Sequence, residues 1–189
     1  DTDYYTPSDP GAPPPAREDF YLVVSALAPY KRADLAISAC QKLDRRLVVI
    51  GSGQDQGRLA KLAGPGTSLL GWQPDAVIRD HLRRCKALLF PGEEDFGIVP
   101  LEAQGCGAPV IALGRGGATE TVVPPETGQP ATGVLYSDAT EQGLIDGILH
   151  FESLGGRFDP TAARVLSDGR LVVLNGRGSG SRPNPGGPD

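Results

Sequence analysis

The sequence predicts an α/β fold in which a parallel β-sheet is covered by helices on both faces. Short, almost entirely apolar runs such as Phe20–Leu27 and Arg46–Ile50 alternate with segments whose apolar residues recur at helical spacing. Strands that are apolar throughout are typical of parallel sheets buried on both sides. Glycine and proline cluster between the runs, where the chain has to turn.

The first half of the chain follows this alternation without a break. We expect, in order, a strand at Phe20–Leu27, a helix at Ala33–Leu43, a strand at Arg46–Ile50, a short helix at Arg58–Ala63 and a short strand at Thr67–Leu70. A further helix is expected to be capped by Asp75, because Ile78, Leu82 and Cys85 then form one apolar stripe.

The alternation continues through the second half. The expected elements are a strand at Ala87–Phe90, a helix with Pro100 in its first turn, strands at Pro109–Ala112 and Gly133–Leu135, a short helix near Ala118–Val123 and a helix at Thr140–Phe151. Asp138 with Glu141 three residues later resembles a capping box for the last helix. Ligands of such sheets bind where strand carboxyl ends meet helix N-termini, so functional residues should directly follow the strands.

Composition divides the 189 residues into three parts. Residues 1–18 are rich in proline and are expected to be an extended linker remnant, residues 19–164 are one domain, and residues 165–189 are an irregular, disordered tail. The absence of methionine suggests a fragment of something longer.

Charge and composition exclude several classes of protein. The net charge of −5 argues against a nucleic-acid surface, which needs a basic stripe. No apolar run approaches the roughly 20 residues of a membrane-spanning helix. Cys40, Cys85 and Cys106 have no metal-binding spacing, so we interpret them as free, mostly buried thiols in a reducing compartment.

The most informative stretch runs from Phe90 to Ile111. It is expected to form a strand, an acidic loop, a tight glycine turn, a helix and a second strand. Glu94 lies in the loop and Glu102 about one turn into the helix, so both carboxylates can face one crevice. Between them, the backbone amides near Phe96, Gly97, Ile98 and Val99 form a helix N-terminus, which attracts phosphate. A loop of solvated carboxylates with ordinary turn glycines is the simpler interpretation of such a pair.

The string from Glu94 to Val110 resembles the E-x7-E signature of family 4 glycosyltransferases, which are retaining enzymes with the two-domain GT-B fold. The resemblance extends to Val24–Lys31, Val48–Gly53, Leu70–Trp72 and Gly116–Glu120, in the family's order, and covers about Phe20 to Phe151. Within that family, the residues Pro29–Arg32 and Gly92–Ile98 look most like those of bacterial mannosyltransferases of surface-polysaccharide synthesis. The resemblance implies that the domain is a Rossmann-like sheet forming the C-terminal, donor-binding half of a GT-B fold.

The resemblance also implies a role for each candidate residue. Glu102 would accept hydrogen bonds from the ribose hydroxyls, and Glu94 would contact hydroxyls of the donor sugar. Lys31 would lie against the diphosphate and offset its charge as it leaves, with Arg32 sharing that task or simply solvated. Gly51 and Gly53 would let the backbone approach the nucleotide, and the loop ending at Trp72 would border the base.

One position departs from the family pattern. Many members carry an arginine five residues before the lysine, and here Ala26 stands in that place. Diphosphate binding would then rest on Lys31, Arg32 and helix amides. The resemblance implies no bound metal and a nucleotide-sugar donor, GDP-mannose before UDP-sugars.

The implied partners follow from the two-domain architecture. An N-terminal, acceptor-binding GT-B domain would be missing, so we expect this chain to bind nucleotide and to be inactive in transfer alone. The implied location is cytoplasmic, or peripheral at the inner face of the membrane through the missing half. Two alternatives stay open at this point: a non-catalytic nucleotide-sugar-binding subunit, and a GT-B-type sugar-nucleotide epimerase.

Overall fold

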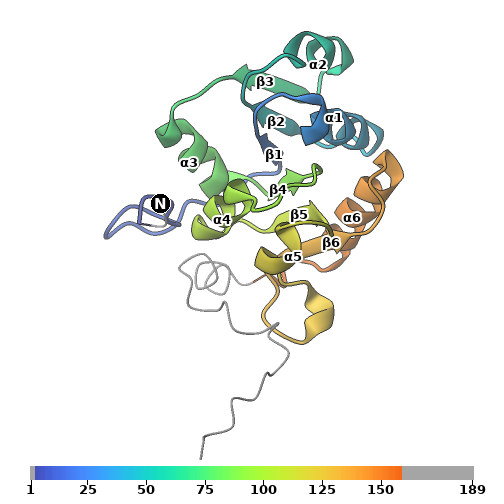
Figure 1. The fold of residues 1–189 in the computed structure, drawn as a ribbon. Helices are drawn as coiled ribbons and strands as arrows, with labels where there is room; N and C mark the ends of the chain where they lie inside the picture. Colours follow the sequence, from blue (N-terminus) through green and yellow to red (C-terminus); the bar gives the residue numbers. More distant parts are fainter. Residues whose placement is uncertain (1–2, 159–189) are drawn as a thin grey trace, which may run out of the picture.

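The computed structural model describes residues 3 to 158. The strands of this part form one parallel β-sheet (Figure 1). The strand order is β3-β2-β1-β4-β5-β6, and each neighbouring pair is parallel. The strands are β1 (Tyr21–Val24), β2 (Leu47–Ile50), β3 (Thr67–Gly71), β4 (Ala87–Phe90), β5 (Val110–Leu113) and β6 (Gly133–Tyr136). The predicted α/β, Rossmann-like class is confirmed. The end of the expected domain at residues 159–164 and the expected tail at 165–189 lie outside the described residues.

Helices cover both faces of this sheet (Figure 1). One face carries α1 (Ala33–Lys42), α2 (Gln56–Leu62) and α6 (Glu141–Ser153), and the other carries α3 (Asp75–Arg84), α4 (Ile98–Gly105) and α5 (Ala118–Thr121). Two short 3-10 helices, η1 (Pro29–Lys31) and η2 (Pro125–Thr127), lie in connections. The arrangement follows from strands that must be covered on both sides.

Each face of the sheet has its own apolar core, because successive side chains of a strand point to opposite sides. In β1, Tyr21 and Val23 pack under α1 and α6, whereas Leu22 packs under α3 and α4. The chain order reverses at β1, which pairs with β2 on one side and β4 on the other. The carboxyl ends of β1 and β4 therefore flank the crevice in which open α/β sheets bind ligands.

Two predicted helix caps are wrong. Pro74, with extended backbone, is the N-cap of α3, and Asp75 is the first helical residue. Thr140 rather than Asp138 caps α6, and its Oγ1 accepts the Gly143 N–H at 3.1 Å. The Asp138 carbonyl instead accepts the Thr140 N–H, which closes a turn before the helix begins. Both errors shift an element's start without changing which face it buries.

The first part of the segment before β1 is not extended. Residues 3 to 12 contain turns, and Tyr5 is buried in the core beneath α3 and α4. Arg83 of α3, itself 9% exposed, donates to the Thr6 carbonyl and to the Asp9 carboxylate. The expected extended conformation is therefore wrong for this part, whereas the role of residues 1–18 as a linker remains a prediction.

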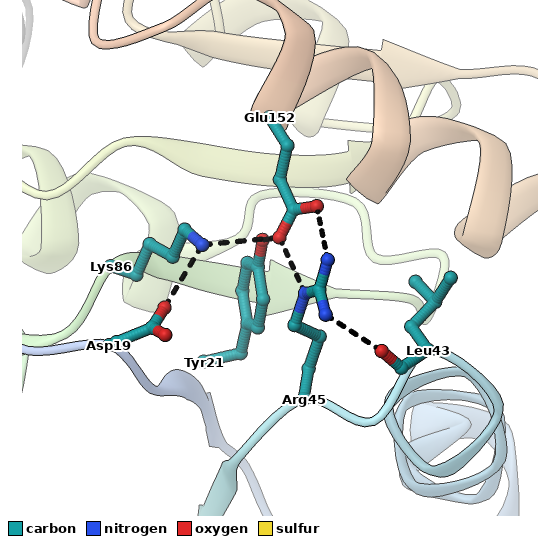
Figure 2. A network of polar contacts seen from close by, with 6 residues as sticks. All are labelled: Asp19, Tyr21, Leu43, Arg45, Lys86 and Glu152. Carbon is teal, nitrogen blue, oxygen red and sulfur yellow. Dashed lines mark hydrogen bonds and ion pairs between the residues drawn. The ribbon is translucent and has the colours of Figure 1, made fainter.

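A single carboxylate ties the amino-terminal edge of the sheet to α6 (Figure 2). Glu152 accepts two hydrogen bonds from Arg45, at 2.8 and 2.9 Å, one from the Tyr21 hydroxyl at 2.9 Å and one from Lys86 at 3.1 Å. These donors stand at or just before the starts of β1, β2 and β4. Hydrogen bonds from Arg45 hold the pKa of Glu152 at about 2, with Tyr21 and Lys86 acting in the same direction against burial.

The three cysteines are free and buried, as predicted, and burial raises the pKa of each thiol to about 12. Their thiolate fraction at neutral pH is therefore negligible. Among residues 3 to 158, no helix is long and apolar enough to cross a membrane.

Replacing Glu152 with Gln is expected to lower the free energy of unfolding by about 1–3 kcal/mol at pH 7, because hydrogen bonds to a charged acceptor are lost or weakened. The folded pKa of about 2 lies below the ordinary value of 4.5. The contribution is therefore complete above the ordinary value and is lost as the pH falls through the folded pKa. Urea unfolding of parent and variant at pH 7 and pH 3 should show a smaller difference at pH 3.

The matched control is Glu126→Gln. The Glu126 side chain is 64% exposed and its carboxylate lies 3.7 Å from the His150 ring. We expect this change to alter stability by no more than about 0.5 kcal/mol. Equal stability of Glu152→Gln and the parent at pH 7 would contradict the assignment.

Candidate functional site

The loops that follow β1, β2, β4 and β5 meet at the carboxyl edge of the sheet. The loop after β2 packs on the loop after β1, because a Cβ at Gly51 would lie 1.8 Å from the Ser25 carbonyl oxygen and one at Gly53 would lie 2.4 Å from that of Leu27. No side chain larger than hydrogen fits at Gly51, whose φ is +140°. This close approach is to the chain itself, and an approach to a nucleotide stays a prediction.

Lys31 and Glu94 form an ion pair across this edge. The Lys31 Nζ lies 2.5 Å from the Glu94 Oε1, and the two side chains are only 15% and 24% exposed. Lys31 ends η1, directly after β1, and Glu94 lies in the loop after β4. The pair therefore lies where the strand order reverses, and the ammonium also stands 5.2 Å from the centre of the Tyr30 ring. The two residues that the sequence proposed as catalytic are in direct contact.

Backbone contacts hold both members of this pair. A Cβ at Gly92 would lie 3.0 Å from the Lys31 Cα, so the loop after β4 rests on η1. On its other side, the Gly117 N–H donates to the Glu94 carbonyl at 2.8 Å, and a Cβ at Gly116 would lie 2.2 Å from that oxygen. Gly92, Gly116 and Gly117 were not among the predicted site residues. The motif that begins at Gly116 was visible in the sequence, but its contact with the Glu94 loop was not.

The N-terminus of α4 lies directly after the Glu94 loop. Gly97 is the N-cap with φ +68°, and no side chain caps the helix. Phe96 and Ile98 are 64% and 59% exposed, so solvent reaches this end of the helix. The first amides of a helix have no acceptor within it, and together with the helix dipole they favour an anion. The amides predicted to attract phosphate, those of Phe96, Gly97, Ile98 and Val99, therefore lie at a helix start that solvent can reach.

Glu102 occupies the fifth position of α4 and is partly buried. Burial raises the pKa of its carboxyl, and the nearby Asp75 carboxylate at the start of α3 acts in the same direction. Glu102 also acts electrostatically on the Tyr5 hydroxyl. Glu94 faces Lys31, whereas the electrostatic neighbours of Glu102 lie at α3 and near Tyr5. A carboxylate that has lost solvation gains from hydroxyl donors supplied by a ligand.

The remaining candidate residues differ in whether their side chains already have polar partners. Arg32 has left-handed backbone with φ +54°, and its Nε lies 3.3 Å from the Asp34 carboxylate. Asp34 also lies 3.9 Å from Arg58, which pairs with Asp55 at 2.6 Å. Trp72, directly after the carboxyl end of β3, is 73% exposed. A non-glycine residue with left-handed backbone is often part of a functional site.

Among residues 3 to 158, no cluster of three or more histidine, cysteine or acidic residues has the geometry to hold a metal ion. A cavity of about 580 Å³ lies at the opposite edge of the sheet, beside Glu152 and Phe151. The charged side chains at the carboxyl edge, with the start of α4, form the candidate site.

Comparison with known proteins identifies the family. The sequence pattern of the family described as "Glycosyl transferases group 1" matches residues 8–165. The chain belongs to this family. It is 34% identical, over 138 residues, to a GDP-mannose-dependent monoacylated alpha-(1-6)-phosphatidylinositol monomannoside mannosyltransferase of Corynebacterium glutamicum; the match covers 65% of this chain and 35% of that enzyme.

Solved structures share the fold. A glycosyltransferase of Rickettsia africae matches with a TM-score of 0.72 at 20% identity, over 90% of this chain and 50% of its own. The Anabaena protein HepE, solved with UDP-glucose, matches with a TM-score of 0.67 at 23% identity, over 82% of this chain and 46% of its own. The chain spans half or less of each of these proteins, and the predicted GT-B type of architecture is confirmed for the part it shares.

Gly116→Ala is expected to destabilise the glycosyltransferase domain more than Gly128→Ala, although both glycines have positive φ, +59° and +73°. The Gly128 variant meets nothing within 4 Å and should lose only the backbone preference, about 1 kcal/mol. The Gly116 variant must also displace the Glu94 carbonyl, which should cost about 1–3 kcal/mol more. Urea unfolding measures both, and equal losses would show that the loop contact does not constrain the site.

Proposed function

We propose that this domain is the donor-binding half of a retaining GT-B glycosyltransferase. With an acceptor-binding domain it would transfer a sugar from a nucleoside diphosphate to an acceptor hydroxyl. The observation that carries the proposal is the Lys31–Glu94 pair beside the accessible N-terminus of α4, at the point where the strand order reverses. A cation, free amides and a carboxylate at one place suit a diphosphate joined to a polyhydroxyl sugar.

Each residue then has a chemical task. The Lys31 ammonium and the first amides of α4 offset the charge that develops on the departing diphosphate. Glu102 accepts hydrogen bonds from the ribose diol, and Glu94 accepts them from the donor sugar. Trp72 borders the base with its exposed ring, and the loop of Gly51 and Gly53 forms the adjacent wall. None of these tasks requires a metal ion, so the nucleotide affinity should be the same in the presence of EDTA.

The favoured donor is GDP-mannose, since the corynebacterial relative is named as GDP-mannose-dependent. UDP-sugars come second, since HepE was solved with UDP-glucose. Among residues 3 to 158, we identify no side chain whose hydrogen-bonding groups would distinguish guanine from uracil. The base is therefore a matter for measurement.

A second candidate is a non-catalytic nucleotide-sugar-binding subunit. Ala26 favours it, because a second cation at that position would help to stabilise a departing diphosphate. The two candidates share the same donor site and differ in whether sugar is transferred once an acceptor-binding domain is present.

Isothermal titration with GDP, UDP, GDP-mannose and UDP-glucose tests the donor site. Glu102→Ala is expected to weaken binding of the preferred nucleotide by about 1–3 kcal/mol, because the ribose hydroxyls lose a charged acceptor. Glu126→Ala, at a carboxylate 64% exposed beside His150, is the control and should bind like the parent. If Glu102→Ala also binds like the parent, the ribose assignment is wrong.

We expect the 189-residue chain alone to transfer no sugar above background, because the proposal places the acceptor contacts on another domain. A radiolabelled-donor assay with a panel of lipid and sugar acceptors measures this directly. Rapid transfer by the chain alone would contradict the proposed division of labour between two domains.

A further inference from the structure

The Lys31–Glu94 pair already joins the two groups that the proposed function assigns to different parts of the donor. Lys31 is assigned to the diphosphate and Glu94 to the sugar, yet their charged atoms lie 2.5 Å apart. Both side chains are more than three-quarters shielded from solvent. Water screens such a pair less than a surface pair, so its Coulombic attraction is substantial.

The cations of the surrounding loops have acidic partners as well. In the described part of the chain, Arg32 lies 3.3 Å from Asp34, and Arg58 lies 2.6 Å from Asp55. Arg115, in the turn after β5, lies 4.0 Å from Glu93, but both side chains are more than half exposed, so water screens this pair far more than the Lys31–Glu94 pair. The position of the additional arginine is taken by Ala26. A diphosphate that binds one of these cations therefore competes with a carboxylate for it.

The backbone restricts how this exchange can occur. Gly92 rests on Lys31, and the turn of Gly116 and Gly117 packs against the Glu94 carbonyl. The main chains on both sides of the pair are held by these contacts. With the main chains held, a change of partner falls to the side chains of Lys31 and Glu94.

We propose that Glu94 is the resident counter-ion of Lys31 and that the diphosphate of an incoming nucleotide displaces it. The released carboxylate then becomes an acceptor for hydroxyls of the donor sugar. This inference rests on the proposed function and adds a coupling to it. The leaving group is bound only as the sugar-contacting carboxylate is set free, and Glu94 lowers the affinity for nucleotides that carry no sugar.

Glu94→Gln tests this coupling by removing the competing charge while keeping the shape of the side chain. We expect the 189-residue variant to bind the preferred nucleoside diphosphate, GDP or UDP, about three- to fivefold more tightly than the parent in isothermal titration. The matching nucleotide-sugar should gain less, because its hydroxyls lose a charged acceptor. The ratio of nucleotide-sugar affinity to nucleotide affinity should therefore fall.

Glu93→Gln is the matched control, since it removes the same charge from the neighbouring residue of the same loop. Its side chain is 60% exposed and faces Arg115 rather than Lys31. We expect its nucleotide affinity to stay within about twofold of the parent. Thermal unfolding of both variants checks that each remains folded. An equal gain in Glu93→Gln and Glu94→Gln would overturn the proposal, because it would indicate a general charge effect.

Lys31→Met separates the failure of this inference from the failure of the proposed function. If Lys31 binds the diphosphate, this variant loses about tenfold or more in nucleotide affinity, and adding Glu94→Gln to it brings no gain. A loss in Lys31→Met without any gain in Glu94→Gln would overturn the exchange and leave the donor site standing. Unchanged binding by Lys31→Met would overturn both, and so would a parent chain that binds none of the four nucleotides.

Discussion

At four glycines of the carboxyl edge, the backbone of another loop lies where a side chain would otherwise be. Gly51 and Gly53 admit the carbonyls of Ser25 and Leu27, and Gly116 and Gly117 admit the main chain of residues 94 to 96. These contacts join the loop after β1 to the loop after β2, and the loop after β4 to the loop after β5, so each pair of loops is held without flexible side chains. The loops that carry Lys31 and Glu94 are positioned by main-chain contacts, so only side chains need to respond to a ligand.

The two edges of the sheet are stabilised by different means. At the amino edge, Glu152 of α6 accepts charge-assisted hydrogen bonds from residues at or just before the starts of three strands, and so connects these strands to α6. The cations there are engaged in holding elements together. At the carboxyl edge, main-chain contacts at glycines hold the loops, and Lys31 pairs with Glu94. The cavity beside Glu152 lies at the amino edge, away from the candidate site.

The proposed function depends on the balance of charges at the carboxyl edge more than on the presence of the Glu94–Glu102 motif. Ala26 leaves the edge with one cation fewer than the family pattern provides, and the arginines nearby lie beside carboxylates. In the proposed function, nucleotide binding would draw on Lys31, on the amides at the start of α4 and on the partly buried carboxylate of Glu102. A donor-binding half with these properties would hold a nucleotide-sugar ready for a domain that supplies the acceptor.

The sequence by itself determined the class of fold, the order of nearly all elements, the burial of the three cysteines and the placement of Lys31 and Glu94 after apolar strands. These features follow from local apolar periodicity, from glycine and proline at turns, and from the rule that ligands meet strand carboxyl ends. The cap of α6 was misplaced by two residues because Asp138 and Thr140 both precede the helix, and the cap of α3 by one residue because Pro74, which offers no capping side chain, occupies that position. Only the tertiary structure decided that Lys31 contacts Glu94, that Gly116 supports Glu94 and that Glu152 ties three strands to α6. Each of these contacts joins residues that are distant in the chain, and their proximity depends on the strand order rather than on any local pattern.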